Sequence, residues 1–143
     1  MSTTNVTTIN RIALSRLLWA ACLAIVVASL ANLVVYVVAD TLWSVAWESS
    51  FNAMLVVVGT IGALVIAATV FAVVARVAKN PIKTYTLIAT LVLLLSFAPP
   101  VLALFGIPGP SVAPLDTVIV MILTHTIAFV VTIVIFTRLL RES

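Results

Sequence analysis

The chain has one histidine, His125, which lies inside a long apolar run next to Thr124. An imidazole can donate or accept a hydrogen bond, carry a proton, contact a ligand or bind a metal. Three roles therefore stay open for His125. It can bond to a helix backbone, to Thr124 or to Asn32; it can contact a ligand or carry a proton; or it can ligate a haem iron. Bis-histidine haem ligation within one chain is excluded, because there is no second histidine.

No other pattern in the sequence indicates a catalytic or metal site. There is no glycine-rich nucleotide-binding motif and no Ser-His-Asp set, and the single cysteine, Cys22, cannot form an intrachain disulfide. We predict no catalytic residues, no metal site and no bound cofactor, with a single-histidine haem contact or a quinone left open.

Composition predicts a membrane protein. Of the 143 residues, 64% are hydrophobic and only 8% are charged, whereas about a quarter of the residues in a soluble domain are charged. A water-soluble fold of this size could not bury so much apolar surface, so the surrounding solvent must be lipid.

Four apolar runs, each of about 22 residues, are long enough to cross the hydrocarbon layer as helices. They comprise residues 17–39, 53–75, 84–105 and 115–136. A helix pairs its backbone groups within one span, whereas a barrel would show short alternating segments. We predict an all-α, polytopic membrane protein in which a single domain, 1–143, forms a four-helix transmembrane bundle.

The basic residues predict the orientation. All seven lie on one side of the predicted membrane: Arg11, Arg16, Arg76, Lys79, Lys83, Arg138 and Arg141. Because basic residues are enriched in cytoplasmic segments, both termini and the loop 79–83 are predicted to be cytoplasmic. The same placement accounts for the net charge of +3, so we predict no nucleic-acid partner.

The predicted outer side carries acidic and aromatic residues. Asp40, Glu48 and Asp116 would form an acidic rim, and Trp43 and Trp47 lie four positions apart between the first two runs. Tryptophan often sits at the level of the lipid headgroups. We predict that both tryptophans are interfacial anchors, on a short helix that lies along the outer surface.

Helices in lipid pack through small residues and interhelical hydrogen bonds. Such residues recur on one face of three runs: Ala20, Ala24, Ala28, Asn32 and Tyr36 in the first, Gly59, Ala63 and Ala67 in the second, and Thr117, Met121, Thr124, His125, Ala128 and Thr132 in the fourth. We predict that these faces point into the bundle. His125, about 15 Å along its run, would then lie near the middle of the bilayer, buried against another helix or a partner subunit.

Three stretches carry a resemblance: ANLVVYVVA (31–39), LLLSFAPP (93–100) and DTVIVMILTHTIA (116–128). With the four-span layout, they resemble a family of small bacterial membrane proteins catalogued only as a domain of unknown function, over nearly the whole chain. The motifs of this family fall on Asn32, Ser96, Pro99, Pro100, Asp116 and His125. The resemblance implies no reaction. It adds Ser96 to the candidates for a polar core or ligand contact, which become Asn32, Ser96, Thr124 and His125.

We predict a non-enzymatic, structural or accessory component of a membrane assembly in the bacterial inner membrane, as a homo-oligomer or bound to a larger membrane protein. The alternative is a small-molecule binding or transport bundle with an outward-facing polar pocket around His125 and Asn32. Pumps and proton-coupled carriers generally keep a charged residue within the membrane, and these runs contain none apart from Asp116, the second residue of the fourth run. A tightly packed interior would favour the accessory role, and an opening that reaches His125 would favour binding.

Overall fold

The computed structural model describes residues 16–45, 51–107 and 111–140, and within these ranges it is helical with no β-strand. The helices are α1 (Leu17–Trp43), α2 (Ala53–Val77), α3 (Pro81–Ser96), α4 (Ala98–Ala103) and α5 (Leu115–Leu139). Four helical stretches are long and apolar enough to cross a membrane, and α3 with α4 forms one of them, Pro81–Ala103. The predicted all-α fold with four membrane-spanning helices is confirmed.

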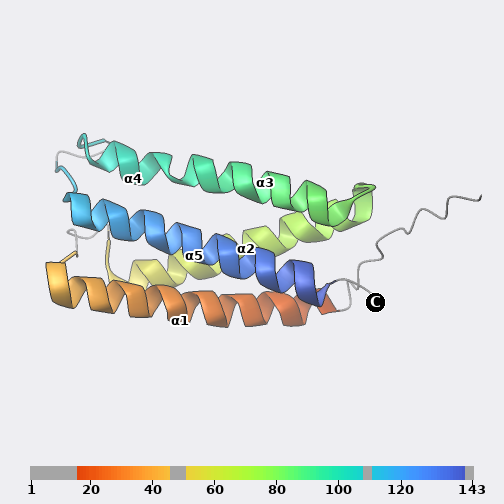
Figure 1. The fold of residues 1–143 in the computed structure, drawn as a ribbon. Coiled ribbons are helices and arrows are strands. Elements are labelled where there is room, and N and C mark those ends of the chain that lie inside the picture. The colour runs from red at the N-terminus through yellow and green to blue at the C-terminus, as the bar shows by residue number, and fades with distance from the viewer. Residues whose placement is uncertain (1–15, 46–50, 108–110, 141–143) are drawn as a thin grey trace, which may run out of the picture.

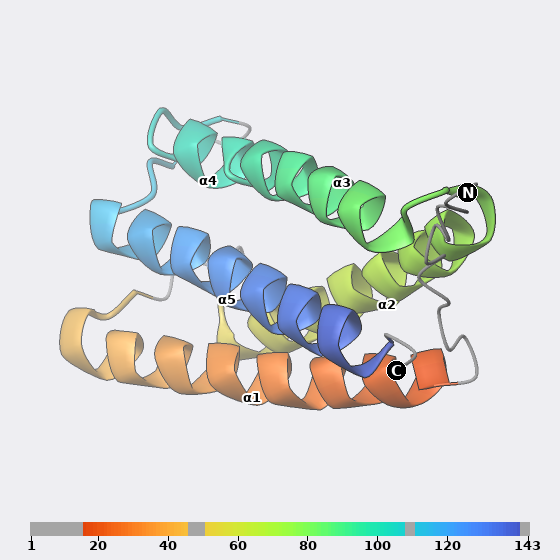
Figure 2. The same ribbon diagram turned by 45° about the vertical axis from the view of Figure 1, so that its right-hand side comes forward.

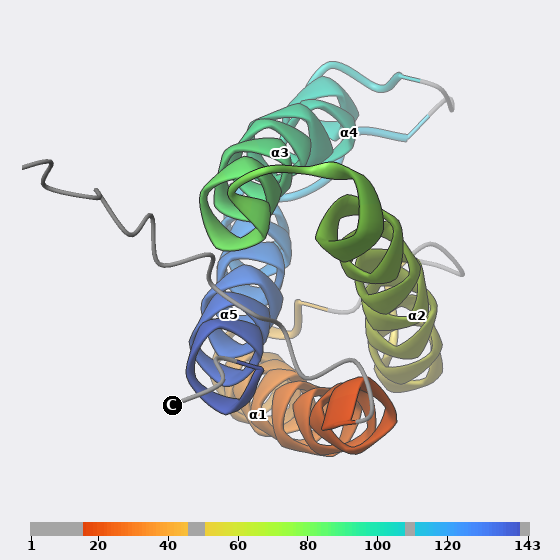
Figure 3. The ribbon, with the colours of Figure 1, turned by 90° about the vertical axis from the view of Figure 1, so that its right-hand side faces the viewer.

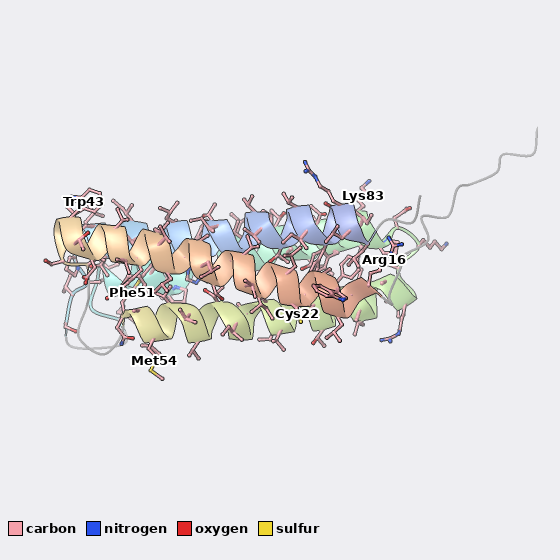
Figure 4. All side chains as sticks on the ribbon, turned by 90° about the horizontal axis from the view of Figure 1, so that it is seen from below. Arg16, Cys22, Trp43, Phe51, Met54 and Lys83 are labelled. Atoms are coloured by element: carbon pink, nitrogen blue, oxygen red, sulfur yellow. The ribbon has the colours of Figure 1, made fainter. Side chains whose placement is uncertain are left out.

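The four spans run alternately up and down beside one another (Figure 1). Viewed end-on, they form a ring in which both α1 and α3 lie between α2 and α5 (Figure 3). Arg16 and Lys83 lie at one end of the bundle, called here the basic end, and Trp43 lies at the opposite end (Figure 4).

Local sequence sets where the helices begin and end. The side chain of Asn52 accepts a hydrogen bond of 3.0 Å from the backbone N–H of Leu55 and so caps the start of α2. α1 ends at Trp43, and the next residue, Ser44, adopts the left-handed conformation with φ 54°. Residues 40–43 are therefore the last turn of α1 and not part of a separate surface helix. Trp47 and Glu48 lie outside the described residues.

The third span is interrupted between α3 and α4, at Phe97. Pro99 and Pro100 have no backbone N–H. The carbonyl oxygen of Ser96 therefore cannot receive the hydrogen bond that residue 100 would give it in a regular helix. α4 continues for only six residues beyond this break.

The small residues of α1 form a buried column. Ala20, Ala24 and Ala28 are each 1% exposed or less, and Asn32 and Tyr36 extend the column toward the opposite end. Because alanine allows close approach of helix backbones in lipid, α2 and α5 both pack against this face. The prediction for the first helix is confirmed.

An aromatic cluster joins the other three spans at the basic end. The ring of Phe71 on α2 lies 4.9 Å from that of Tyr85 on α3 and 5.3 Å from that of Phe136 on α5, and all three residues are buried. Away from this cluster α2 and α3 diverge, so that the first turns of α2 lie beside α1 (Figures 1 and 2).

The buried face of α2 differs from the predicted one. Gly59 and Ala63 are exposed, whereas Thr60 and Leu64, one position further along, are buried. One position turns the face by about 100°. The prediction that Gly59 and Ala63 contact another helix of this chain is wrong. Bulkier side chains, among them Leu64 and Phe71, face the bundle along the splayed helix instead.

These packing environments predict different effects on stability for two leucine substitutions. Ala28→Leu inserts a large side chain where there is no exposed surface, and overpacking should lower the unfolding free energy by about 1–3 kcal/mol. Gly59→Leu is the matched control, because a Cβ on Gly59 would meet no atom within 4 Å. Thermal unfolding in detergent should show a lower midpoint for the first variant only. Equal midpoints for the two variants would contradict the assigned faces.

Candidate functional site

Asn32 forms a hydrogen bond between two helices. Its side-chain Nδ2 donates to the Oγ1 of Thr60 on α2 at 3.0 Å, and Thr60 Oγ1 donates in turn to the carbonyl oxygen of Val56 at 2.7 Å. The single proton of the Thr60 hydroxyl is thus in use, so this oxygen can only accept from Asn32. That fixes which end of the Asn32 amide faces α2.

The other end of the Asn32 amide is left without a donor. Its Oδ1 is buried and has no hydrogen-bond partner among the described residues, and the same holds for the Oγ of Ser29 one turn earlier. A buried acceptor without a donor costs about 1–3 kcal/mol. Sequence reasoning missed Ser29 and Thr60; their signal was a hydroxyl within an apolar run.

Thr124 is buried on α5, and its hydroxyl donates to the carbonyl oxygen of Met121 at 2.8 Å. It lies at the depth of Asn32, because Tyr36 and Val120, each four residues toward the opposite end, share one cluster. Asn32 and Thr124 thus face the interior from α1 and α5.

His125 is exposed, although it lies about 3 Å from the midpoint of α5. Its Nδ1 is 2.7 Å from the carbonyl oxygen of Met121, within the same helix. The prediction that the ring is buried and bonded to another helix of this chain is wrong. Thr124 occupies the face toward α1, and the amide of Asn32 is turned to Thr60 instead.

His125 nevertheless lies on the face of α5 that packs against the third span. Val118, His125 and Phe136 are spaced by seven and eleven residues, which returns to one helical face. Phe136 packs against Tyr85 of α3 with ring centroids 5.8 Å apart, and Val118 packs in one cluster with Ala103 of α4. His125 thus lies between two packed levels of the same stripe without being covered itself.

α3 shows the same interruption from its own side. Ser96 follows Tyr85 by eleven residues, which places it on the same face and opposite His125 in the antiparallel pair. Ser96 is half-buried, and Val92, between the two on this face, is 57% exposed. No hydrogen bond joins Ser96 to His125 in the described structure. His125 and Val92 are thus both exposed, although each lies on the face through which α5 and α3 pack together nearer the basic end.

Asp40 and Asp116 lie at the opposite end, away from His125. Asp116 accepts a hydrogen bond of 2.8 Å from the backbone N–H of Thr117, and Asp40 is half-buried in the last turn of α1. Trp43 is 60% exposed, as an interfacial anchor would be. Among the described residues, no three His, Cys, Asp or Glu side chains form a group that could hold a metal ion.

A family model matches residues 12–142, which is almost the whole chain, and its description is a family of unknown function, DUF6069. The chain belongs to the DUF6069 family. No curated protein and no solved structure matches it. The expected membership of an unknown-function family is confirmed, and the family brings no activity to the residues described above.

The Asn32–Thr60 bond predicts energetic coupling between α1 and α2. Asn32→Ala and Thr60→Val should each destabilise the bundle, and the double variant should lose less than the sum. We expect a coupling energy of about 0.6 kcal/mol, which is the usual size of a hydrogen bond between helices in lipid. A double-mutant cycle of unfolding free energies measures it. Strict additivity would mean that this bond does not stabilise the fold.

Proposed function

We propose that this multi-pass membrane protein is a non-enzymatic binding protein, which holds a small molecule between α3 and α5 at the middle of the bundle. The observation that supports it is the exposure of His125 between two packed levels of one helix face. In lipid, a polar nitrogen without a partner, such as Nε2 of His125, is costly, and intramembrane ionisable residues usually face protein or a pathway. An occupant at this depth would supply the missing contact.

The arrangement favours a molecule that enters from the hydrocarbon layer. His125 lies near the midpoint of its helix, and the nearby Val92 and Leu95 on α3 are 57% and 73% exposed. The acidic residues Asp40 and Asp116 belong to the far end of the bundle. Binding from within the membrane therefore suits the site better than the outward-facing polar pocket predicted from the sequence.

An accessory role in a membrane assembly is the second candidate, and the surface of α2 supports it. Gly59, Gly62 and Ala63 are exposed, and a Cβ on either glycine would meet no atom within 4 Å. Such small residues allow a neighbouring transmembrane helix to approach closely. On this reading, the residues predicted to pack within the chain would pack against another one.

Binding between α3 and α5 can be tested without assuming the chemistry of the ligand. A small apolar photoreactive probe, trifluoromethyl phenyl diazirine, should label residues 93–97 and 122–129 saturably in the full chain in lipid. Labelling of the lipid-facing Leu87 and Val130 should rise without saturation. Ser96→Phe should reduce the saturable labelling, and Thr69→Phe on the exposed side of α2 should not. Non-saturable labelling throughout would refute the binding function and leave the accessory role.

We also propose that the basic end lies in the cytoplasm of a bacterial cell, with both termini on that side. Arg16, Lys83 and Arg138 support this orientation by the preference of basic residues for the cytoplasmic side.

Single cysteines test the orientation, in a Cys22→Ala background that contains no other thiol. A cysteine at Ser111 should react with an impermeant maleimide added to intact cells, because this residue precedes α5 at the opposite end. A cysteine at Asn80 should react only after the cells are opened. The reverse pattern would invert the proposed topology.

A further inference from the structure

The tautomer of His125 determines what its exposed nitrogen can bind. A carbonyl oxygen only accepts hydrogen bonds, so the 2.7 Å contact with Met121 places a proton on Nδ1. In the neutral ring, Nε2 then carries a lone pair and no proton. This nitrogen has no hydrogen-bond partner among the described residues. Lipid chains cannot donate to it.

Ser96, opposite the histidine, likewise offers acceptors. Its hydroxyl donates to the carbonyl oxygen of Leu93 at 2.7 Å, so its only proton is in use and the oxygen can still accept. Its carbonyl oxygen receives nothing from Pro99 or Pro100, which have no N–H. Three acceptors therefore lie at the same depth of the α3–α5 pair, namely Nε2 of His125 and two oxygens of Ser96.

Several hydroxyl protons at this depth are already in use, although the hydroxyl of Ser29 on α1 is unpaired within the described part of the chain. The hydroxyls of Thr60 and Thr124 both donate to their own helices, and Oδ1 of Asn32 has no donor at all. Thr60 and Thr124 thus cannot turn toward His125 without giving up a bond that they already make. A molecule between α3 and α5 can supply the missing proton to Nε2.

We infer that the site between α3 and α5 selects a neutral, lipid-soluble molecule that donates hydrogen bonds through hydroxyl or N–H groups, with Nε2 of His125 as acceptor. This inference rests on the proposed binding function and adds the chemical class of the ligand. A molecule of the same shape that carries only acceptors leaves Nε2 and Ser96 unpaired. It also buries its own oxygens against them. A site whose buried polar groups are left unpaired discriminates strongly between such analogues.

Three probes of similar shape isolate the donor. The first, tert-butylhydroquinone, has two hydroxyl donors. The other two, its dimethyl ether and tert-butylquinone, have none. The full chain is reconstituted in lipid nanodiscs with ¹⁵N-labelled histidine, so that His125 gives the only imidazole signals. Under anaerobic conditions the hydroquinone should shift the Nε2 signal and leave Nδ1 protonated. It should bind at least about tenfold more tightly than the other two, equivalent to about 1.4 kcal/mol.

Variants separate this inference from the proposed function. His125→Phe should abolish the preference for the hydroquinone, and Thr69→Val, which removes an exposed hydroxyl that donates to its own helix, should retain it. Equal or tighter binding of the ether or the quinone would overturn the inference and leave the binding function in place. Failure of all three probes to bind would also overturn it. If saturable photolabelling were absent as well, the binding function would fall with it.

Discussion

A polar group in the hydrocarbon layer must find its partner within protein, and in this chain the hydroxyls find it in their own helices. Most threonine and serine hydroxyls in the spans donate to a carbonyl oxygen three or four residues earlier. They are those of Thr41, Thr60, Thr69, Thr86, Thr90, Ser96, Thr124, Thr126, Thr132 and Thr137. Their protons are therefore not available to neighbouring helices. Side-chain hydrogen bonds that join distant elements include those from Asn32 to Thr60 and from Thr117 to the carbonyl of Val45.

Shape consequently holds most of the bundle together. The alanine column of α1 gives α2 and α5 a close contact, and the rings of Phe71, Tyr85 and Phe136 fill the basic end. Neither the alanine column nor the aromatic cluster reaches the part of the third span that is farthest from the basic end. There α2 has diverged toward α1. The third span itself is broken at Phe97, between α3 and α4. The bundle is thus well packed along α1 and less well packed along α3, where Ser96 lies opposite His125 of α5.

The spans and the α1 face could be predicted because each depends on sequence alone. The length of an apolar run sets a span, and alanines at four-residue spacing set a face. The face of α2 could not be predicted, because Gly59 and Thr60 are both reasonable packing residues. The choice between them depends on the tilt of α2 against Phe71 and Tyr85. The exposure of His125 was missed for a related reason: its stripe does point inward, but the helix opposite does not cover it.

The break in the third span lies at the depth of His125. In an unbroken helix, residue 100 would donate to the carbonyl oxygen of Ser96, but proline has no N–H to give. An unpaired acceptor thus lies on α3 at the depth of His125, while α4 beyond the break packs on α5 through Ala103. Asn32 offers the contrast. Its Oδ1 also lacks a donor, but it is sealed between α1 and α2 where the alanine column packs tightly. In the proposed function, accessibility, and not the mere presence of an unpaired acceptor, is what distinguishes the α3–α5 site from Asn32.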